Sequence, residues 1–139
     1  MSRPDPRAEA ERWLAQAEND LAFAEHGLRL GFYAQTCFLA QQVAEKALKA
    51  LHYARGARIV IGHSVDGLLE ALEPEAAELG ELRSMAKELD QHYVPARYPN
   101  ALPGTAPFQV YTEEQASRAI EAARRIVAFV ARRVRAPSA

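Results

Sequence analysis

The stretch from Ala34 to Leu51 constrains the fold of this chain more than any other part of it. Its pattern predicts a long helix with a seam of small residues that recur at spacings of three and four: Cys37, Ala40, Ala44 and Ala47. Small side chains on a seam let a neighbouring helix come close, and larger apolar residues widen the surface beside them. Exposure of an apolar surface this wide to water is unfavourable, so other helices must cover it. We therefore expect a helical bundle, and in addition a second subunit.

The other helices are predicted from periodicity and from capping signals. A first helix is expected over residues 8–29, delayed by two prolines, and the second over residues 32–54. Ser64 is expected to cap a short third helix, and Pro74 fits the first turn of a fourth. Thr112 opens a capping box for a strongly periodic last helix.

Residues 94–111 form the one long irregular segment expected in the chain. Four prolines lie in it, at a density that we expect to forbid a helix: Pro95, Pro99, Pro103 and Pro107. A loop of this length in a compact helical domain is either functional or mobile. The whole chain, residues 1–139, is predicted to be one all-α domain, an antiparallel up-and-down bundle of four long helices plus one short helix.

Charge is distributed unevenly along the chain, although the net charge is only −1. That balance argues against a protein that coats nucleic acid through bulk electrostatics. Acidic residues predominate over residues 66–90, whereas the last helix carries arginines every seven residues, at Arg118, Arg125 and Arg132. We expect this stripe to face solvent or to pair with the acidic fourth helix. Binding to RNA or to an acidic partner is the alternative.

The sequence also indicates a cellular compartment. Cys37 is the only cysteine, so the chain cannot form an internal disulfide, which suits a reducing environment. The first six residues hold no apolar run typical of a secretory signal, and no stretch approaches the ~20 apolar residues that span a membrane. We therefore expect a cytoplasmic protein with no membrane segment.

Several catalytic motifs are missing from the sequence. It has no Gly-x-Gly-x-x-Gly loop, no Asp-x-Asp pair for a catalytic metal and no Gly-x-Ser-x-Gly elbow. Its four histidines lack the spacing of zinc ligands. We therefore expect neither a metal nor a cofactor.

Three segments together resemble the HEPN family of small helical domains, and they cover nearly the whole chain in the family's order. The segment similar to the family's opening helix is Trp13-x3-Ala17-x2-Asp20-Leu21-x2-Ala24. The segment similar to its second helix is Gln41-Gln42-x2-Glu45-Lys46-x2-Lys49. The part similar to the family's downstream signature is His63-Ser64-Val65 followed by Tyr93-x4-Tyr98.

The resemblance implies a helical bundle that dimerises and has one of two roles. One is to bind a nucleotide or act as the interaction partner of a minimal nucleotidyltransferase encoded beside it, often as a toxin–antitoxin pair. The other is a metal-independent ribonuclease with an arginine and a histidine four to six residues apart. There the histidine would move the proton of a ribose 2′-hydroxyl, and the arginine would stabilise the phosphorane charge.

Arg58 and His63 are the only arginine and histidine with that spacing, which makes them the catalytic candidates. Their position departs from the nuclease branch of the family, where the pair opens a late helix. Val65 also stands where that branch commonly has a tyrosine. The alternative for His63 is a role in capping the third helix.

The candidates for nucleotide binding are Lys49, Tyr93, Arg97 and Tyr98. A planar guanidinium and two tyrosines can stack on a base and hold a phosphate. The alternative is a loop pinned to the bundle by tyrosine packing and an arginine–carboxylate bond. The alternative for Lys49 is a surface pair with Glu45, four residues before it.

The sequence thus gives three hypotheses. The first is a HEPN-type protein that binds a nucleotide or RNA, forms a dimer or larger homo-oligomer, and acts with a separately encoded minimal nucleotidyltransferase. The second is a metal-independent RNA endonuclease toxin that uses Arg58 and His63. The third is an assembly module without a ligand.

Overall fold

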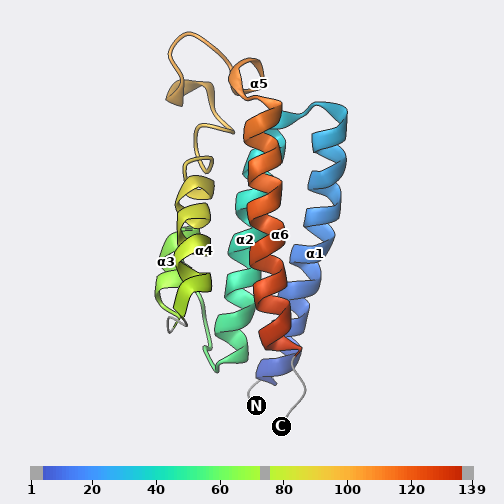
Figure 1. Cartoon of the computed structure of the whole chain (residues 1–139), viewed down its shortest axis with the longest axis vertical. Coiled ribbons are helices and arrows are strands. Elements are labelled where there is room, and N and C mark those ends of the chain that lie inside the picture. The colour runs from blue at the N-terminus through green and yellow to red at the C-terminus, as the bar shows by residue number, and fades with distance from the viewer. Residues whose placement is uncertain (1–4, 73–75, 136–139) are drawn as a thin grey trace.

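The structure is a computed structural model. It describes residues 5–72 and 76–135, and for residues 76–79 it describes the backbone only. This part of the chain contains no strand, and no helix in it is long and apolar enough to cross a membrane. Four helices are long: α1 (Pro6–Leu30), α2 (Tyr33–Ala54), α4 (Ala76–Asp90) and α6 (Glu113–Val134). They run alternately up and down (Figure 1), which confirms the predicted all-α bundle.

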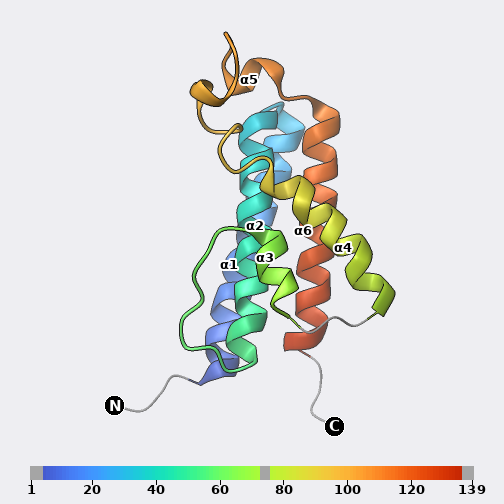
Figure 2. The same cartoon turned by 90° about the vertical axis from the view of Figure 1, so that its left-hand side faces the viewer.

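Helix α2 is the central helix of the bundle. It packs along α1 and along α6, while α4 and the short helix α3 (Val65–Glu70) cover its remaining side (Figures 1 and 2). The small seam of α2 is fully buried, as predicted: Cys37, Ala40, Ala44 and Ala47. Within a single chain, α1 and α6 therefore supply the close neighbours that this seam requires.

Burial also decides the chemistry of the single thiol. Cys37 is fully buried in the core, and desolvation raises the pKa of its thiol to about 12. The side chain is therefore a neutral thiol at physiological pH and lacks the nucleophilic thiolate form.

Helix α1 begins two residues earlier than the sequence suggested. Asp5 is its N-cap, and the Asp5 carboxylate accepts a hydrogen bond from the Arg7 backbone N–H at 3.0 Å. Pro6 occupies the first helical position, where its missing N–H would have no helical partner in any case. The expectation that this proline delays the helix was wrong.

Two further helix starts were predicted correctly. Ser64 caps α3, because its hydroxyl accepts the Gly67 backbone N–H at 2.9 Å. Thr112 and Gln115 form the expected capping box of α6. The Gln115 backbone N–H donates to the Thr112 hydroxyl at 3.2 Å, and the Thr112 backbone N–H donates to the Gln115 side-chain oxygen at 2.9 Å. Pro74, expected in the first turn of α4, lies outside the described residues.

Residues 94–111 are less irregular than expected. They contain the 3-10 helix η1 (Pro99–Ala101) and the four-residue helix α5 (Pro107–Val110). Each begins with a proline, since proline has the right φ for a first helical position and needs no hydrogen-bond partner there. The prediction that the prolines forbid any helix here was therefore wrong, although they limit both helices to about one turn.

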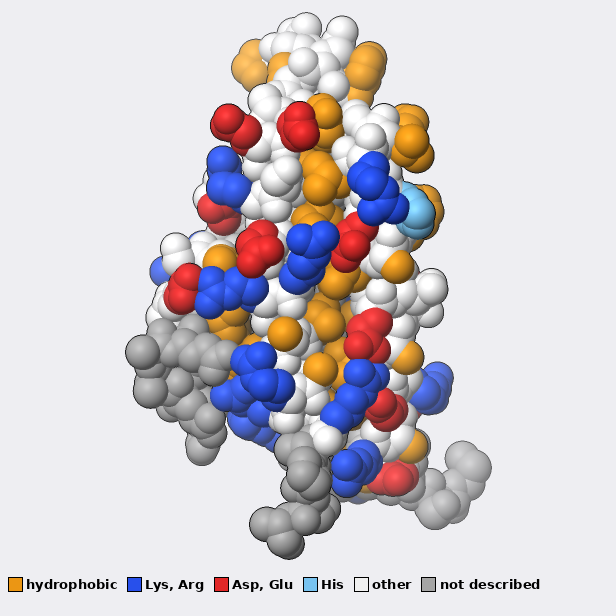
Figure 3. Space-filling view, turned by 45° about the vertical axis from the view of Figure 1, so that its right-hand side comes forward, with side chains coloured by type: hydrophobic (Ala, Val, Ile, Leu, Met, Phe, Trp, Pro, Cys, Tyr) orange, Lys and Arg blue, Asp and Glu red, His pale blue; other side chains and the backbone are white. Residues whose placement is uncertain are grey.

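Two arginines of the α6 stripe, Arg118 and Arg125, pair with helix α4. Arg118 contacts Glu88 of α4 at 2.7 Å, and Arg125 forms a two-pronged ion pair with Glu81. Acidic and basic side chains accordingly alternate over the face shown in Figure 3. Solvent screens exposed pairs of this kind, so each adds little to stability. They link α4 to α6 at the surface.

His92 is buried where the chain leaves α4 and later enters α6. Its Nδ1 lies 3.3 Å from the Tyr111 hydroxyl, and the two rings meet edge to face with centroids 5.4 Å apart. Burial lowers the pKa of His92 below its ordinary value of 6.5, with Glu88 opposing this shift and Arg118 adding to it. The folded protein therefore favours the neutral imidazole.

This burial predicts an acid-sensitive fold. The unfolded chain takes up the His92 proton at a higher pH than the folded chain, so the free energy of unfolding should fall as pH drops below 6.5. Urea denaturation at several pH values should show this decline, and His92→Gln should flatten it. The control His26→Gln alters an exposed histidine and should keep the decline. An equally steep decline in the His92→Gln variant would contradict the burial of a neutral His92.

Candidate functional site

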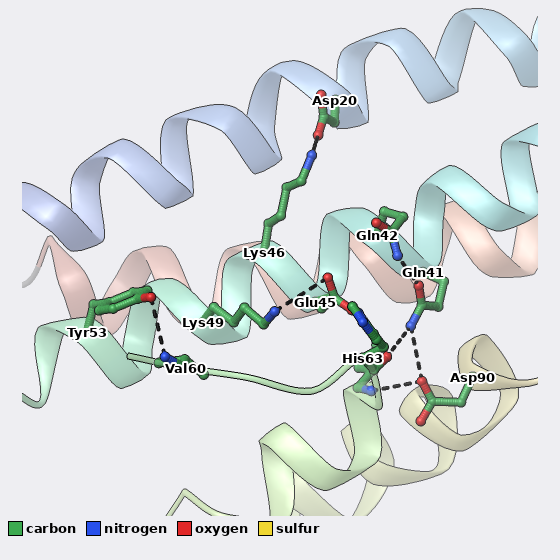
Figure 4. A network of polar contacts seen from close by, with 11 residues as sticks. Asp20, Gln41, Gln42, Glu45, Lys46, Lys49, Tyr53, Val60, His63 and Asp90 are labelled. Atoms are coloured by element: carbon green, nitrogen blue, oxygen red, sulfur yellow. Dashed lines mark hydrogen bonds and ion pairs between the residues drawn. The ribbon is translucent and has the colours of Figure 1, made fainter. Parts of the chain in front are cut away.

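Three buried polar side chains form a ladder on one face of helix α2. Gln41, Glu45 and Lys49 are spaced four apart, and each residue is 7% exposed or less. Buried polar groups need hydrogen-bond partners or opposite charges. The partners of this polar ladder come from the loop over residues 55–64 and from the end of α4 (Figure 4).

The first rung, Gln41, fixes the start of α3. Its amide nitrogen donates to the His63 carbonyl at 2.6 Å and to Asp90 Oδ1 at 3.3 Å. The Asp90 carboxylate also accepts the first two backbone N–H groups of α3, at 2.8 and 3.1 Å, and the Ser64 hydroxyl at 2.9 Å. A carboxylate at a helix N-terminus is favourable in itself. Asp90 therefore joins α4, α3 and α2 at one point.

The second rung, Glu45, orients the His63 side chain. His63 Nδ1 lies 3.0 Å from Glu45 Oε1, and Lys49 Nζ lies 3.8 Å from the other carboxylate oxygen. Because the carboxylate accepts, this contact assigns a proton to Nδ1 and leaves Nε2 for other partners. The His63 side chain is 63% exposed, and Nε2 makes no hydrogen bond to the described part of the chain.

The Glu45–Lys49 pair corrects an expectation from the sequence. A surface pair was the alternative given for Lys49, whereas both residues are buried. The reason is that this side of α2 faces the loop over residues 55–64 (Figure 4), so the two charges stabilise a covered surface.

Arg97 lies among aromatic rings. Its guanidinium carbon is 4.5 Å from the centroids of Phe38 and Tyr93 and 4.9 Å from that of Tyr98. Its Nε donates to the Tyr93 carbonyl at 2.7 Å. Within the described residues no carboxylate pairs with Arg97, and neither Nη group makes a hydrogen bond. The rings therefore hold a guanidinium whose outer donors are unpaired.

Tyr93 joins His63 to Arg97. The His63 ring stacks on the Tyr93 ring with centroids 5.2 Å apart and 18° between the planes. The same tyrosine ring carries Arg97 at 4.5 Å. We call these five residues the aromatic–basic cluster: Phe38, His63, Tyr93, Arg97 and Tyr98. It combines, on one aromatic support, an oriented imidazole with a guanidinium whose Nη groups are unpaired among the described residues.

The structure brings four of the six predicted site residues into this cluster: His63, Tyr93, Arg97 and Tyr98. Lys49 is linked to it only through Glu45, and its ammonium is buried 5.9 Å from the Trp13 ring centroid. Arg58 is exposed on the 55–64 loop and makes no described contact with His63. No group of three or more His, Cys, Asp or Glu side chains among the described residues is placed to hold a metal ion.

Sequence reasoning missed Gln41, Glu45 and Asp90 as the residues that build the site. Gln41, Glu45 and Lys49 do recur at a spacing of four, but Gln42 and Lys46 share that spacing, so the sequence alone did not distinguish the buried set. Phe38 carried no signal either, since in the sequence it resembles any other apolar residue of α2.

The three sequence segments that resemble the HEPN family meet one another in space. Asp20 of the first segment pairs with Lys46 of the second at 2.5 Å. Gln41 and Glu45 of the second segment bind the backbone and the side chain of His63 in the third. The segments are therefore joined by these contacts of Asp20, Gln41 and Glu45, which Figure 4 shows.

Comparison with known proteins agrees with this arrangement. The family model of the HEPN domain matches residues 10–134, and the chain belongs to the HEPN domain family. It is similar to the crystal structure of TT1696 from Thermus thermophilus, with 44% identity and a TM-score of 0.82 over 88% of this chain and 95% of that one. It is also similar to ST0689, described as an archaeal HEPN homologue, with 36% identity, a TM-score of 0.74 and coverage of 96% and 99%.

Two further relatives also match most of this chain. A HEPN domain protein of Thermotoga maritima, TM0613, is 32% identical with a TM-score of 0.68, over 91% of this chain and 99% of that one. A protein of Methanocaldococcus jannaschii named "Putative toxin MJ1304" is 28% identical over 130 residues, which are 87% of this chain and 85% of the relative.

The free energy of unfolding tests whether Asp90 joins α4, α3 and α2. Asp90→Ala removes the shared acceptor of α3 and α2 and should lower the free energy of unfolding by roughly 2–4 kcal/mol. The control Glu88→Ala removes one exposed ion pair and should cost less than about 1 kcal/mol. Urea denaturation measures both. Equal losses in the two variants would contradict a central role for Asp90.

Proposed function

We propose that this HEPN protein binds a nucleotide or RNA at the aromatic–basic cluster, in a toxin-type role. The observation that carries the proposal is Arg97, a guanidinium held by three rings with both Nη groups unpaired among the described residues. A planar guanidinium with free donors matches the oxygens of a phosphate. The toxin name of the Methanocaldococcus jannaschii relative supports the toxin-type role.

The surroundings of Arg97 favour a phosphate over a carboxylate of the protein itself. An arginine–carboxylate bond was the alternative explanation for this residue, and the described residues supply no carboxylate to it. The aromatic rings restrict the guanidinium before any ligand arrives, which reduces the ordering that binding would require. His63, on the same Tyr93 ring, presents an exposed imidazole beside it.

We further propose that the chain forms a homodimer and acts with a separately encoded minimal nucleotidyltransferase. The resemblance to the HEPN family supports both partners. A dimer is also supported by exposed apolar residues of α1 and the α1–α2 turn, which border a hollow of about 810 Å³: Phe23, Leu30 and Phe32. Clustered apolar side chains on a small domain are typical of association surfaces.

Binding should depend on Arg97. Titration of the protein with AMP and with a structured RNA, followed by calorimetry, should show Arg97→Ala weakening affinity about tenfold or more. Arg97→Lys keeps the charge but loses the planar fork, so it should recover only part of the affinity. Arg124→Ala, which breaks an exposed pair with Glu25, is the control and should bind like the parent. Unchanged affinity in Arg97→Ala would contradict the proposal.

A second candidate function, a metal-independent ribonuclease, is favoured by the Glu45–His63 contact. A buried carboxylate that orients an exposed imidazole is the arrangement a general base requires. Here His63 Nε2 would accept the proton of a ribose 2′-hydroxyl. Arg58 was the predicted partner, but it is Arg97 that shares an aromatic ring with His63.

An RNase assay in EDTA separates the two functions. If the protein is a ribonuclease, the parent should cleave a structured RNA, and His63→Ala should lower the rate by about 100-fold or more. Arg58→Ala tests the arginine predicted from spacing. Cleavage retained by His63→Ala would exclude His63 as the base, and no cleavage by the parent would leave binding as the function.

A further inference from the structure

A hollow of about 360 Å³ opens beside the aromatic–basic cluster, between α2 and α5. Its wall includes Gln35 and Phe38 of α2, Arg97, and Pro107 and Phe108 of α5. The volume lies within the ~300–1,000 Å³ range of small-molecule sites. The guanidinium proposed to bind phosphate therefore also borders a space that a second part of the same ligand can enter.

Phe108 is an aromatic residue with room for a stacking partner. It is 71% exposed, and no ring or cation contact engages it within the described part of the chain. Tyr93, by contrast, already carries His63 and Arg97 on its ring. Of the rings around Arg97 and the hollow, Phe108 is therefore the one best placed to receive a new planar group.

The position of Phe108 is fixed by its neighbours. Pro107 is buried, and its carbonyl accepts the Tyr111 N–H at 3.1 Å. The Gln109 side chain accepts the Ala106 backbone N–H at 3.0 Å. The backbone of the turn that carries Phe108 is therefore already ordered before a ligand stacks on the ring, which limits the ordering that binding requires.

We propose that this hollow receives the base of a nucleotide or of a single-stranded RNA end, with Phe108 as the stacking ring. Arg97 would hold the phosphate, and the exposed Gln35 amide would reach the polar edge of the base. The proposal rests on the proposed nucleotide-binding function and adds where the base lies. A wholly apolar occupant fits less well, because it would cover the unpaired Arg97 donors without replacing their water.

The test compares ligands that share a phosphate but differ in the base. AMP, ribose 5-phosphate and inorganic phosphate are titrated into the parent, Phe108→Ala, Phe108→Tyr and Ile59→Ala by calorimetry. Phe108→Ala should weaken the affinity for AMP on the order of tenfold and leave the affinity for ribose 5-phosphate unchanged, because only AMP loses a stacking contact. Phe108→Tyr keeps a ring and should bind AMP like the parent. Ile59→Ala is the control, since Ile59 is 77% exposed and lies on another loop.

Each other outcome has a defined meaning. Unchanged AMP affinity in Phe108→Ala, together with weakened affinity in Arg97→Ala, would overturn the base site and leave the proposed function intact. Equal weakening of AMP and ribose 5-phosphate in Phe108→Ala would also overturn it. Absence of AMP and RNA binding by the parent would overturn the proposed function and this inference together. Because Phe108 is exposed, the variant should keep the far-UV circular dichroism of the parent.

Discussion

The polar ladder of Gln41, Glu45 and Lys49 is the constraint on which the rest of the structure depends. These side chains lie on the central helix of the bundle, whose other buried residues are mostly apolar. A buried polar group without a partner costs about 1–3 kcal/mol, so this face cannot simply be covered by another apolar helix. It is covered instead by His63 and Asp90, and these contacts fix the 55–64 loop, the start of α3 and the end of α4 at once.

The aromatic–basic cluster follows from that constraint. With Asp90 fixed against α3, the chain leaves α4 in a defined direction and places Tyr93 against the His63 ring. Arg97 then follows one turn later and bonds back to the Tyr93 carbonyl. The site is therefore held by side chains that are themselves buried or hydrogen-bonded. Such support gives an imidazole and a guanidinium fixed positions before a ligand binds.

The sequence predicted the long helices, the buried seam, the Ser64 cap and the Thr112 capping box, because each depends on residues within a few positions of one another. The helices at Pro99 and Pro107 were missed because proline breaks the interior of a helix but is favoured at the first helical position. Burial of Glu45 could not be predicted from its spacing to Lys49, which is the same on an exposed helix. The spacing between Arg58 and His63 matches the pair expected from the nuclease branch, yet both residues lie in a loop, where the structure describes no contact between them. Contact of Phe38 with Arg97 depends on packing between distant segments.

We propose that Arg97, an ordered guanidinium whose Nη groups have no partner among the described residues, binds phosphate. This proposal is tested most directly by the Nε–H signal of Arg97 in a ¹⁵N-labelled sample, assigned with the Arg97→Lys variant. The structure predicts a signal shifted upfield by the surrounding rings, exchanging slowly because of its bond to the Tyr93 carbonyl, and moving when AMP is added. A signal at the ordinary arginine position that exchanges rapidly and ignores AMP would contradict the account.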